Sequence, residues 1–471
     1  MTVHNKNKDC KTKHLSQKNL TCLSRKVLKN ISQTLSKNEV SEVALESEFI
    51  KRSTSKITGY QFLTSMLISS IQTEHATLEN ISDIFRSHHR VRIRAQSIME
   101  RINSKSAECF LKSILKQVLK NQFDKLSENI SPNLLSFFSK VLIQDSSSCD
   151  LHQKLAPIFR GSGGRASKSS LKLDVIYDFK AKRFEDITLN EGSVADQTLA
   201  SNIIGYISQK SLIIRDLGYL RIDCVSKIVE IGAFFLSRMK NNTRIYLNEK
   251  DTEQLDLAQY LHENLRKTNV VDMKVYITSE KMGVRLIAYR VPEEIAAQRR
   301  RAAHAKAKKE GRTLTERSLT LLDFSLFITN VPEEIWPPGV VGTIYRIRWQ
   351  IELMFKDWKG RLQINCLLGI NHLRISCLMY SRMILILIIN EVYKLLNCIG
   401  GYLSRIVSMH KVYNWMKCAN RLLRVLSGRF SWLEERNLDD IIITSMSHEK
   451  RKRKTSLQSI FEQDFYYMEA C

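Results

Sequence analysis

Glycine and proline are scarce in this sequence, with 17 and 6 residues among 471. Their scarcity excludes collagen-like chains and the proline- and glycine-rich disordered class, and it favours a helix-rich globular protein. Long apolar runs are also lacking, because Arg382 interrupts the most apolar stretch, residues 375–389. A membrane-spanning helix needs about 20 apolar residues in succession. We therefore predict that this stretch is a buried core helix, and we expect no membrane partner.

The cysteines lack the spacing of a metal or redox site. None of the ten cysteines forms a C-x-x-C pair, and such pairs are the usual signal of zinc ligands or of a catalytic disulfide. Scattered thiols of this kind are typical of reducing compartments. No apolar run follows the basic N-terminal segment, as it would in a secretory signal peptide. We expect a cytoplasmic protein.

Acidic residues are outnumbered, because 73 lysines and arginines stand against 48 aspartates and glutamates, a formal net charge of +25. An excess of this size indicates a polyanionic partner, most simply nucleic acid, whose phosphates basic side chains bind. A compositional habit of the source organism is the alternative explanation. The charge is compatible with both, and only motifs can separate them.

The first third of the chain has helical periodicity. Residues 1–20 are polar and lysine-rich and predict a disordered basic arm, whereas apolar residues recur every three or four positions over 21–130 and predict helices. Segments 76–85 and 86–103 look like two short helices joined by a turn. A helix-turn-helix would place the second helix in a DNA groove, and an ordinary bundle with a solvated basic face is the alternative. The arginines expected on this second helix are Arg90, Arg92, Arg94 and Arg101.

The pattern changes to strands after about residue 130. Residues 131–240 predict three strands, a helix, a strand, a helix and a strand, which together make an α/β domain with a mixed sheet. Residues 241–323 predict a separate β-rich segment with one long basic helix. Residues 324–430 return to a strand and then to helices, the first of which begins at prolines. Residues 431–471 form a weakly patterned C-terminal tail.

One predicted helix, residues 342–362, carries a polar stripe opposite an apolar stripe. Helical spacing places Tyr345, Arg348, Glu352 and Lys359 in one sector, with Trp349 beside it. A lone carboxylate among cations suits a site that holds a metal ion and phosphates, while a solvated surface face is the alternative. The opposite, apolar face consists of Ile347, Ile351, Met354 and Trp358.

Two aspartates at predicted strand ends are further candidates. Asp145 ends the first strand of the α/β region, and Asp216 ends the fourth. Taken alone, each is better explained as a strand-end cap or turn residue than as a metal ligand. Phosphoryl transfer with two Mg²⁺ ions, however, needs several oxygen ligands that converge on one spot, and two strand carboxylates with one helix carboxylate would supply them. The first aspartate is the less certain, because Asp150, Asp174 and Asp178 lie nearby in the sequence.

The segment YRIRWQIELMFKDWK, residues 345–359, fits the pattern Tyr-x2-Arg-x3-Glu-x6-Lys. It resembles the YREK signature of bacterial insertion-sequence transposases that have a DDE active site. The blocks QDSSSCDL, RDLGY, FFLSRMK and FITNVPEEIW, in that order, resemble the same family. With a weaker upstream similarity, the resemblance extends over about residues 76–370.

The resemblance implies an α/β fold of a particular kind. A ribonuclease-H-like catalytic core would occupy 131–240 and 324–430, interrupted by a β-rich insertion domain at 241–323. A helical DNA-binding domain would precede this core, and helices would follow it. The implied catalytic and metal-binding residues are Asp145, Asp216 and Glu352, holding two Mg²⁺ ions for which Mn²⁺ can substitute. The implied activity is cut-and-paste transposition in a bacterial, nucleoid-associated protein.

The resemblance also implies how the protein meets DNA. Tyr345, Arg348 and Lys359 would contact the DNA backbone near the cleaved end, where a flipped base needs a stacking surface. Trp349 or Trp336 would provide that surface. In the helical domain we expect DNA contacts from Arg92 and Arg94.

The implied partners are double-stranded DNA at the element ends and at the target, and a second copy of the chain in the DNA complex. We expect no small-molecule substrate. The alternatives are a nuclease that cuts without joining, an inactive DNA-binding remnant that represses the element, and an RNA-binding protein. The last would explain the charge but not the order of the carboxylates.

Overall fold

The computed structural model of the chain consists of two compact units. One contains residues 1–127 and 361–450, and the other contains residues 128–360 and 451–471. The predicted tail and the predicted arm up to residue 16 lie outside the described part of the chain. The structure describes residues 17–52, 55–72, 77–122, 133–163, 167–264, 270–402 and 407–428.

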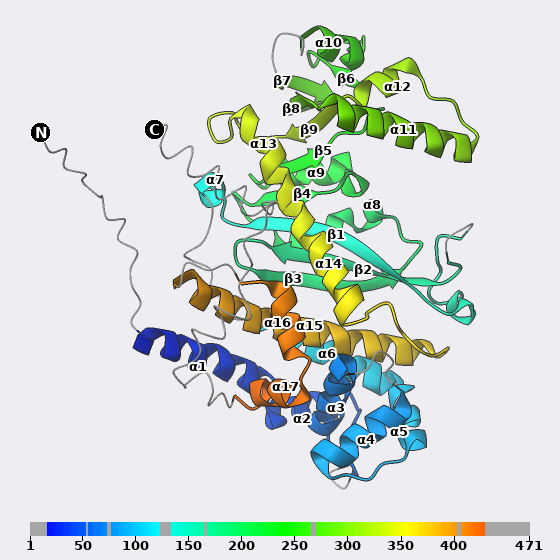
Figure 1. The fold of residues 1–471 in the computed structure, drawn as a ribbon, viewed down its shortest axis with the longest axis vertical. Coiled ribbons are helices and arrows are strands. Elements are labelled where there is room, and N and C mark those ends of the chain that lie inside the picture. The colour runs from blue at the N-terminus through cyan, green and yellow to red at the C-terminus, as the bar shows by residue number, and fades with distance from the viewer. Residues whose placement is uncertain are drawn as a thin grey trace, which may run out of the picture. The chain divides into compact units, whose positions relative to one another are not determined.

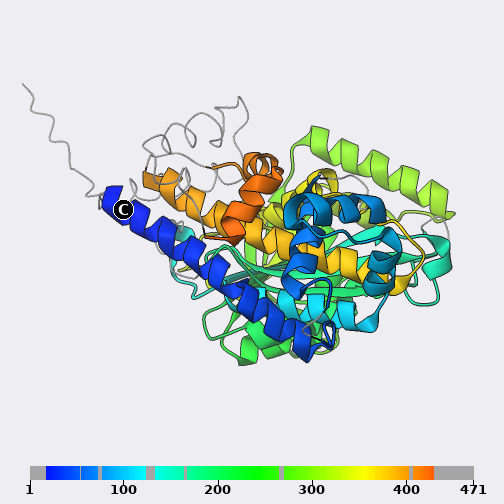
Figure 2. The ribbon, with the colours of Figure 1, turned by 90° about the horizontal axis from the view of Figure 1, so that it is seen from below.

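The first unit is helical over its described residues, as its periodicity predicts. Its long helix α15 (His372–Tyr402) packs against α1 (Gln17–Thr34), α3 (Gly59–Gln72) and α6 (Lys105–Lys120). Figure 2 shows α1 in dark blue and α15 in orange to gold. The remaining helices of this unit are α2 (Lys37–Glu46), α4 (Leu78–His89), α5 (Ala95–Ile102), α16 (Met409–Met416) and α17 (Ala419–Leu426).

The core helix predicted at residues 375–389 is confirmed as part of α15. Within the described residues, α15 is the one helix long and apolar enough to cross a membrane by length and composition, and 89% of its apolar window is buried inside the protein. Arg382, which interrupts the apolar run, is itself 1% exposed and donates a hydrogen bond to the carbonyl of Cys366 at 3.1 Å. A core helix of a globular protein accounts for this pattern.

The prediction that one short helix carries all four arginines of segment 86–103 was wrong. Helix α4 ends at His89 and is capped by Arg90, which adopts the left-handed conformation with φ 56°. The chain then runs extended until α5 begins at Ala95, so Arg92 and Arg94 lie in the link between the helices. Ser82 holds this link by donating a hydrogen bond to the carbonyl of Ile93 at 2.6 Å. Of the four arginines, α5 carries only Arg101.

The second unit is built on one mixed sheet, which confirms the α/β class. Its described strands lie in the order β3-β2-β1-β4-β5-β9-β8-β7-β6. Strands β1, β4 and β5 are parallel to one another, and the other neighbouring pairs are antiparallel. The strands are β1 (Val141–Asp150), β2 (Ser170–Asp178), β3 (Arg183–Glu191), β4 (Leu212–Arg215), β5 (Phe234–Arg238), β6 (Ile245–Tyr246), β7 (Val270–Ile277), β8 (Met282–Arg290) and β9 (Phe324–Thr329).

The strands predicted between 241 and 323 continue this sheet. Strand β9 pairs with β5 on one side and with β8 on the other, so β6, β7 and β8 extend the sheet beyond β5. One apolar core follows from this continuity, because Ile213 of β4 and Leu286 of β8 belong to the same buried cluster. The other short helices are α7 (Asn133–Ser136), α8 (Asp196–Leu199), α10 (Leu257–Asn264) and α12 (Glu316–Leu321), and the predicted basic helix is α11 (Glu293–Glu310).

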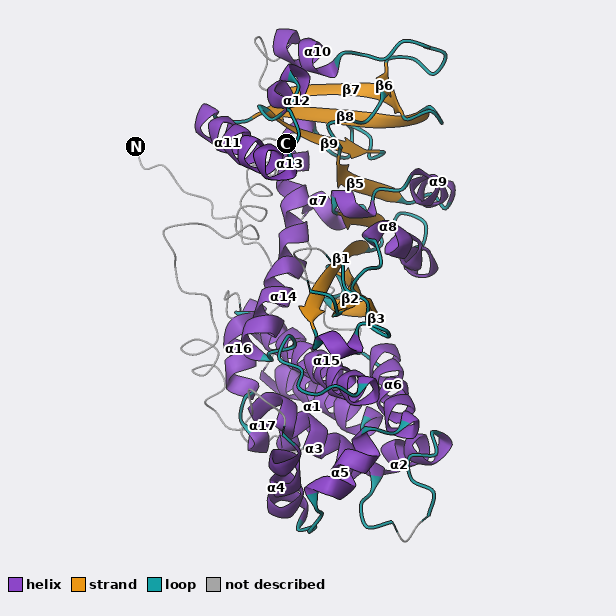
Figure 3. Ribbon diagram, turned by 90° about the vertical axis from the view of Figure 1, so that its right-hand side faces the viewer, coloured by secondary structure: helices purple, strands orange, loops and turns teal. Residues whose placement is uncertain are grey.

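Helices cover both faces of the sheet in this unit. Helices α8 and α9 (Ile222–Glu230) lie on one face, and α13 (Pro338–Tyr345) with α14 (Trp349–Arg361) runs along the other, as Figures 1 and 3 show. The helix predicted at 342–362 is not continuous. One turn of 3₁₀ helix, residues 346–348, separates α13 from α14. Its predicted apolar face is confirmed, because Ile347, Ile351 and Trp358 are 0% exposed and Met354 is 7% exposed.

Candidate active site

Strand register places Asp145 and Asp216 side by side. The parallel pairing of β1 with β4 ends at Gln144 and Arg215, and Asp145 and Asp216 are the next residues along the chain. Neighbouring strands lie about 4.8 Å apart, and side chains alternate between the faces of a sheet. Because Leu142 faces the core beneath α9, Asp145 points to the opposite face.

Asp216 directly follows β4, as its predicted position at a strand end requires. The same expectation for Asp145 was wrong, because β1 continues to Asp150. The physical reason is the partner strand: β2 pairs with β1 along its length, up to Asp150 opposite Ser170, whereas β4 is short. Asp145 therefore lies in mid-strand, at the point where β1 extends past β4.

Arg348 connects the strand carboxylates to the helix. Glu352 lies in the first turn of α14, one helical turn after Arg348. The guanidinium of Arg348 places Nη1 3.2 Å from Oδ2 of Asp145 and Nη2 2.6 Å from Oε1 of Glu352. All three side chains are shielded from solvent, with 13% of Arg348, 15% of Asp145 and 32% of Glu352 exposed. Segments distant in the sequence thus converge on one cationic group.

The pKa of Asp145 depends on its burial and on the charges of the other two carboxylates. Burial is the largest effect, and together with the negative charges of Asp216 and Glu352 it raises the pKa of Asp145 to about 6. The backbone N–H of Ser146 and the guanidinium of Arg348 act in the opposite direction. A carboxylate with such a pKa is held by the fold in a place where its charge is poorly solvated.

Tyr345 lies against the second aspartate. It is 5% exposed, and its hydroxyl donates to the backbone carbonyl of Arg215 and to Oδ1 of Asp216, each at 3.4 Å. Its ring packs against Phe327 with 5.2 Å between ring centroids. Burial raises the pKa of Tyr345 to about 12, so the hydroxyl keeps its proton and acts as a donor near neutral pH. Tyr345, expected at the DNA backbone, is placed here beside Asp216.

The two tryptophans considered as stacking surfaces differ in exposure. Trp336 is 0% exposed, donates its indole N–H to the carbonyl of Leu134 at 2.8 Å, and packs against Phe138. Trp349 is 51% exposed at the start of α14. Trp336 therefore belongs to the core, and Trp349 is the one of the two that a base could reach. Lys359 is half-buried on the same helix.

The competing aspartates have structural partners. Asp174 accepts hydrogen bonds from the hydroxyl of Tyr219 at 2.8 Å and from the side-chain amide of Asn202 at 3.1 Å. Asp178 accepts from the backbone N–H groups of Lys180 and Ala181, at 2.9 and 3.2 Å, and so holds the turn after β2. Asp150 is exposed at the far end of β1. None of the three joins the Arg348 cluster.

A buried network beside Asp145 was missed from the sequence. Gln144 donates to the carbonyl of Leu199 at 2.9 Å and to Oδ2 of Asp174 at 3.2 Å, and its own carbonyl accepts from Arg215 at 3.3 Å. These bonds tie β1, β2 and β4 together directly under the two aspartates. No local motif marks such a network, because its members come from different strands.

The carboxylates have the chemistry that divalent ions require, since Mg²⁺ binds hard oxygen ligands. As arranged, no group of three or more His, Cys, Asp or Glu side chains in the described chain is gathered closely enough to hold a metal ion. The guanidinium of Arg348 lies between Asp145 and Glu352 instead. The side chains are thus of the kind that could hold a divalent ion, and Arg348 takes the place of such an ion between Asp145 and Glu352.

The remaining DNA-contact candidates, Arg92 and Arg94, are exposed in the helical unit. Both lie in the extended link between α4 and α5. Their positions allow contact with a phosphate backbone, but neither side chain lies on a helix that could enter a DNA groove.

Comparison with known proteins identifies the family. Residues 136–388 match the family described as Transposase DDE domain. The chain is 30% identical over 375 residues to the transposase for insertion sequence element IS1151 of Clostridium perfringens, covering 76% of this chain and 79% of that protein. It is 28% identical over 363 residues to the transposase for insertion sequence element IS231B of Bacillus thuringiensis subsp. berliner, covering 74% of this chain and 75% of that protein.

Among solved structures, a piggyBac transposase synaptic complex with hairpin DNA is a distant match. It is 10% identical, with a TM-score of 0.38 over 93% of this chain and 87% of that chain. The family match includes Asp145 on β1, Asp216 directly after β4 and Glu352 on α14. The chain thus belongs to the transposase DDE domain family, as a DDE transposase of insertion-sequence elements.

Proposed function

We propose that Asp145, Asp216 and Glu352 are the catalytic carboxylates of a cut-and-paste transposase. One observation carries the proposal: Asp145 and Asp216 are adjacent in strand register, and Arg348 binds Asp145 and Glu352 together. In this assignment, α13 and α14 carry the Tyr-x2-Arg-x3-Glu-x6-Lys signature. A site of this composition suits the cleavage of a phosphodiester at the element end and its transfer to target DNA.

We assign strands β3-β2-β1-β4-β5 to a ribonuclease-H-like core and β6, β7 and β8 to its insertion. The assignment is supported by where the carboxylates fall, because Asp145 lies on β1 and Asp216 directly follows β4, both in the first group of strands. Glu352 comes from a helix that follows the insertion in the sequence and returns to the same face as Asp145.

Asp145, Asp216 and Glu352 would hold the divalent ions. Bound Mg²⁺, or Mn²⁺ in its place, would stabilise the attacking and leaving oxygens of the phosphodiester. The two aspartates are presented by strands whose positions are set by backbone pairing, so their spacing is fixed before DNA arrives. The hydroxyl of Tyr345 orients the carboxylate of Asp216. Preorganisation of this kind lowers the cost of assembling the site.

The exposed surface of α14 suits DNA. Trp349 is half exposed one helical turn from Leu353, and Lys356 and Lys359 follow on the same helix. An indole stacks on any base, and lysines contact phosphates. We assign Trp349 to a flipped base at the element end and Lys359 to the backbone, with Arg92 and Arg94 as phosphate contacts of the helical unit. Two chains, one for each element end, would form the active complex.

An assay of cleavage and joining tests this function. Full-length protein is incubated with DNA that carries its element ends, target plasmid and Mg²⁺, beside Glu352→Gln and the control Arg346→Gln, whose side chain is exposed. We expect cleavage and joining by the wild type and by the control, and neither by Glu352→Gln. Cleavage without joining would indicate a nuclease. Binding without cleavage in all three proteins would indicate an inactive, repressor-like remnant.

A further inference from the structure

Arg348 occupies the centre of the proposed site. Its guanidinium is 13% exposed and bonds to a carboxylate oxygen of Asp145 on one side and of Glu352 on the other. Its third nitrogen, Nε, is buried and has no hydrogen-bond partner among the described residues. The guanidinium thus neutralises two acids while one of its own donors is left unsatisfied.

A divalent ion and this guanidinium compete for the same oxygens. Two cations cannot both lie between Asp145 and Glu352, because their repulsion at such distances is strong in a poorly solvated site. A metal ion that displaced the guanidinium from these carboxylates would leave Arg348 without an anionic partner. A buried, unpaired positive charge is strongly unfavourable. A phosphate offers a replacement, since it accepts two parallel hydrogen bonds from an arginine.

We propose that Arg348 is the internal counter-ion of the metal-free site and exchanges Asp145 and Glu352 for a DNA phosphate when metal ions bind. The inference rests on the proposed function, because it takes these carboxylates as metal ligands. Its consequence is that metal loading and DNA binding support each other. A transposase without DNA then holds its ions weakly, which limits cleavage away from the element.

Metal binding without DNA provides the test. Free Mn²⁺ is followed by electron paramagnetic resonance while it is titrated into full-length protein, so the readout is independent of catalysis. Arg348→Gln is expected to bind Mn²⁺ about tenfold more tightly than the wild type, because the competing charge is gone. Arg348→Lys keeps the charge but lacks the planar fork, and it should fall between them. The exposed neighbour Arg346→Gln should match the wild type.

The second arm adds a duplex that carries an element end. DNA should raise the Mn²⁺ affinity of the wild type and leave that of Arg348→Gln nearly unchanged. Equal Mn²⁺ affinity of wild type and Arg348→Gln without DNA would overturn the inference. The proposed function fails separately, namely if Glu352→Gln binds Mn²⁺ as the wild type does.

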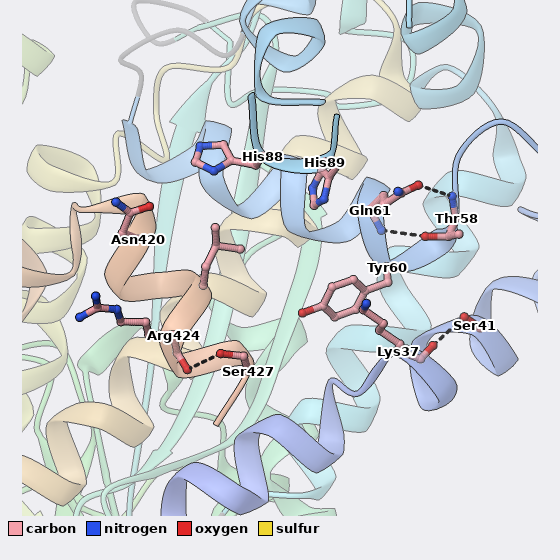
Figure 4. A pocket seen from close by; sticks show the side chains of 11 residues that line it. Lys37, Ser41, Thr58, Tyr60, Gln61, His88, His89, Asn420, Arg424 and Ser427 are labelled. Carbon is pink, nitrogen blue, oxygen red and sulfur yellow. Dashed lines mark hydrogen bonds between the residues drawn. The ribbon is translucent and has the colours of Figure 1, made fainter. Parts of the chain in front are cut away.

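An independent observation concerns the helical unit, which contains a cavity of about 920 Å³. Figure 4 shows side chains of α2, α3, α4 and α17 around it. None of the described residues that line it carries a carboxylate, whereas four carry basic groups. The lining residues are Lys37, Ser41, Thr58, Tyr60, Gln61, His88, His89, Asn420, Leu423, Arg424 and Ser427.

The cavity is electropositive and suited to an anion. Burial lowers the pKa of His89, and the neighbouring charges of His88 and Lys37 lower it further, so this imidazole favours its neutral form. Lys37 and Arg424 are the charged groups of the lining. Lys37 also lies 5.9 Å from the centre of the Tyr60 ring. Lysine, arginine, hydroxyl and amide donors around an aromatic ring are the groups that recognise a nucleotide in nucleic acid.

We propose that this cavity binds a phosphate, with its adjoining nucleotide, of the DNA that the transposase holds. For every phosphate that the protein no longer neutralises, the slope of log affinity against log salt should become less negative by about 0.9. Because both side chains would contact the same phosphate, the double variant Lys37→Gln/Arg424→Gln should make the slope less negative by about 0.9. Lys112→Gln/Lys116→Gln, which alters two exposed lysines of α6 outside the cavity, is the matched control for the removal of two charges.

The ligand source is separated by competition. Two results together support a DNA subsite. ADP displaces the duplex from the wild type only at concentrations far above that of the duplex, and the double variant shows the expected change in salt slope. ADP that binds tightly to the wild type, with an unchanged salt slope in the double variant, would mean a free nucleotide as ligand and would overturn the proposal. An unchanged slope without ADP binding would overturn it as well.

Discussion

Asp145 destabilises the metal-free fold at neutral pH. Its pKa is raised from 3.8 to about 6, mainly by burial, although Arg348 pairs with it. A carboxyl whose pKa is higher in the folded than in the unfolded state favours folding most when protonated. The stabilisation that the protonated carboxyl of Asp145 contributes is fully present below about pH 3.8 and is lost as the pH rises through 6. Functional sites often hold groups in such unfavourable surroundings.

Asp145→Asn should therefore be more favourable for stability, relative to the wild type, at pH 7 than at pH 4. The gain in the free energy of unfolding, variant minus wild type, should grow by at most about 3 kcal/mol between these pH values, since each pKa unit corresponds to about 1.36 kcal/mol. Urea unfolding in EDTA at both pH values measures it. A pH-independent difference would mean that Asp145 has an ordinary pKa.

Tyr345 acts through the position of Asp216. Tyr345→Phe keeps the ring that packs against Phe327 and removes only the hydroxyl that donates to Asp216. We expect cleavage to slow by up to about tenfold, with a loss of about 1 kcal/mol or less in the free energy of unfolding. Single-turnover cleavage and urea unfolding measure the two effects. A large loss of stability with an unchanged rate would contradict the positioning role.

At the scale of elements, the helix pair α13–α14 has a buried face that packs on the sheet and an opposite face that presents functional side chains. The sequence predicted both faces from helical spacing, because the apolar stripe repeats with the period of a helix. It did not predict the 3₁₀ turn at 346–348, since a single tightened turn leaves that period almost unchanged. The buried face sets where the helix lies, and the other face presents Glu352 and Trp349.

Substitution of two tryptophans of α14, one on each face, tests the roles of the two faces separately. Trp358 is 0% exposed and packs against Phe184 and Phe355, with ring centroids 5.7 and 5.3 Å away. Trp358→Ala should lower the free energy of unfolding by about 3 to 5 kcal/mol. Trp349→Ala should change it by about 0.5 kcal/mol or less and instead weaken cleavage at the element end. Equal losses of stability in both variants would contradict the division.

At the scale of the whole molecule, the net charge of +25 is the property most visible from outside. Charge of this sign binds DNA by releasing counterions, and the effect depends on the number of phosphates contacted rather than on the chemistry of the site. DNA binding and catalysis are therefore separable by experiment.

DNA affinity should fall steeply with salt. For six to ten phosphate contacts, we expect a loss of about 10³ to 10⁵ in affinity between roughly 50 and 200 mM salt. Fluorescence anisotropy with a labelled element end measures it. Glu352→Gln should show the same slope, because the carboxylate does not contact phosphate. A shallow slope would show that few of the basic residues meet DNA.

The sequence by itself determined the helical character of the first unit, the order of strands and helices from β1 to β5 in the second, the buried helix α15 and the two faces of α14. These features depend on local periodicity, which neighbouring residues express. It also determined the family, through an ordered set of motifs. The tail and most of the arm lie outside the described residues, so those expectations stay predictions.

Only the tertiary structure decided how the site is assembled. The adjacency of Asp145 and Asp216 depends on the register of two paired strands, and the pairing of Arg348 with Asp145 depends on a helix packed across that sheet. The burial of Trp336 and the left-handed turn at Arg90 likewise depend on surroundings. Register and packing join residues that are distant in the chain, so no local pattern in the sequence specifies them.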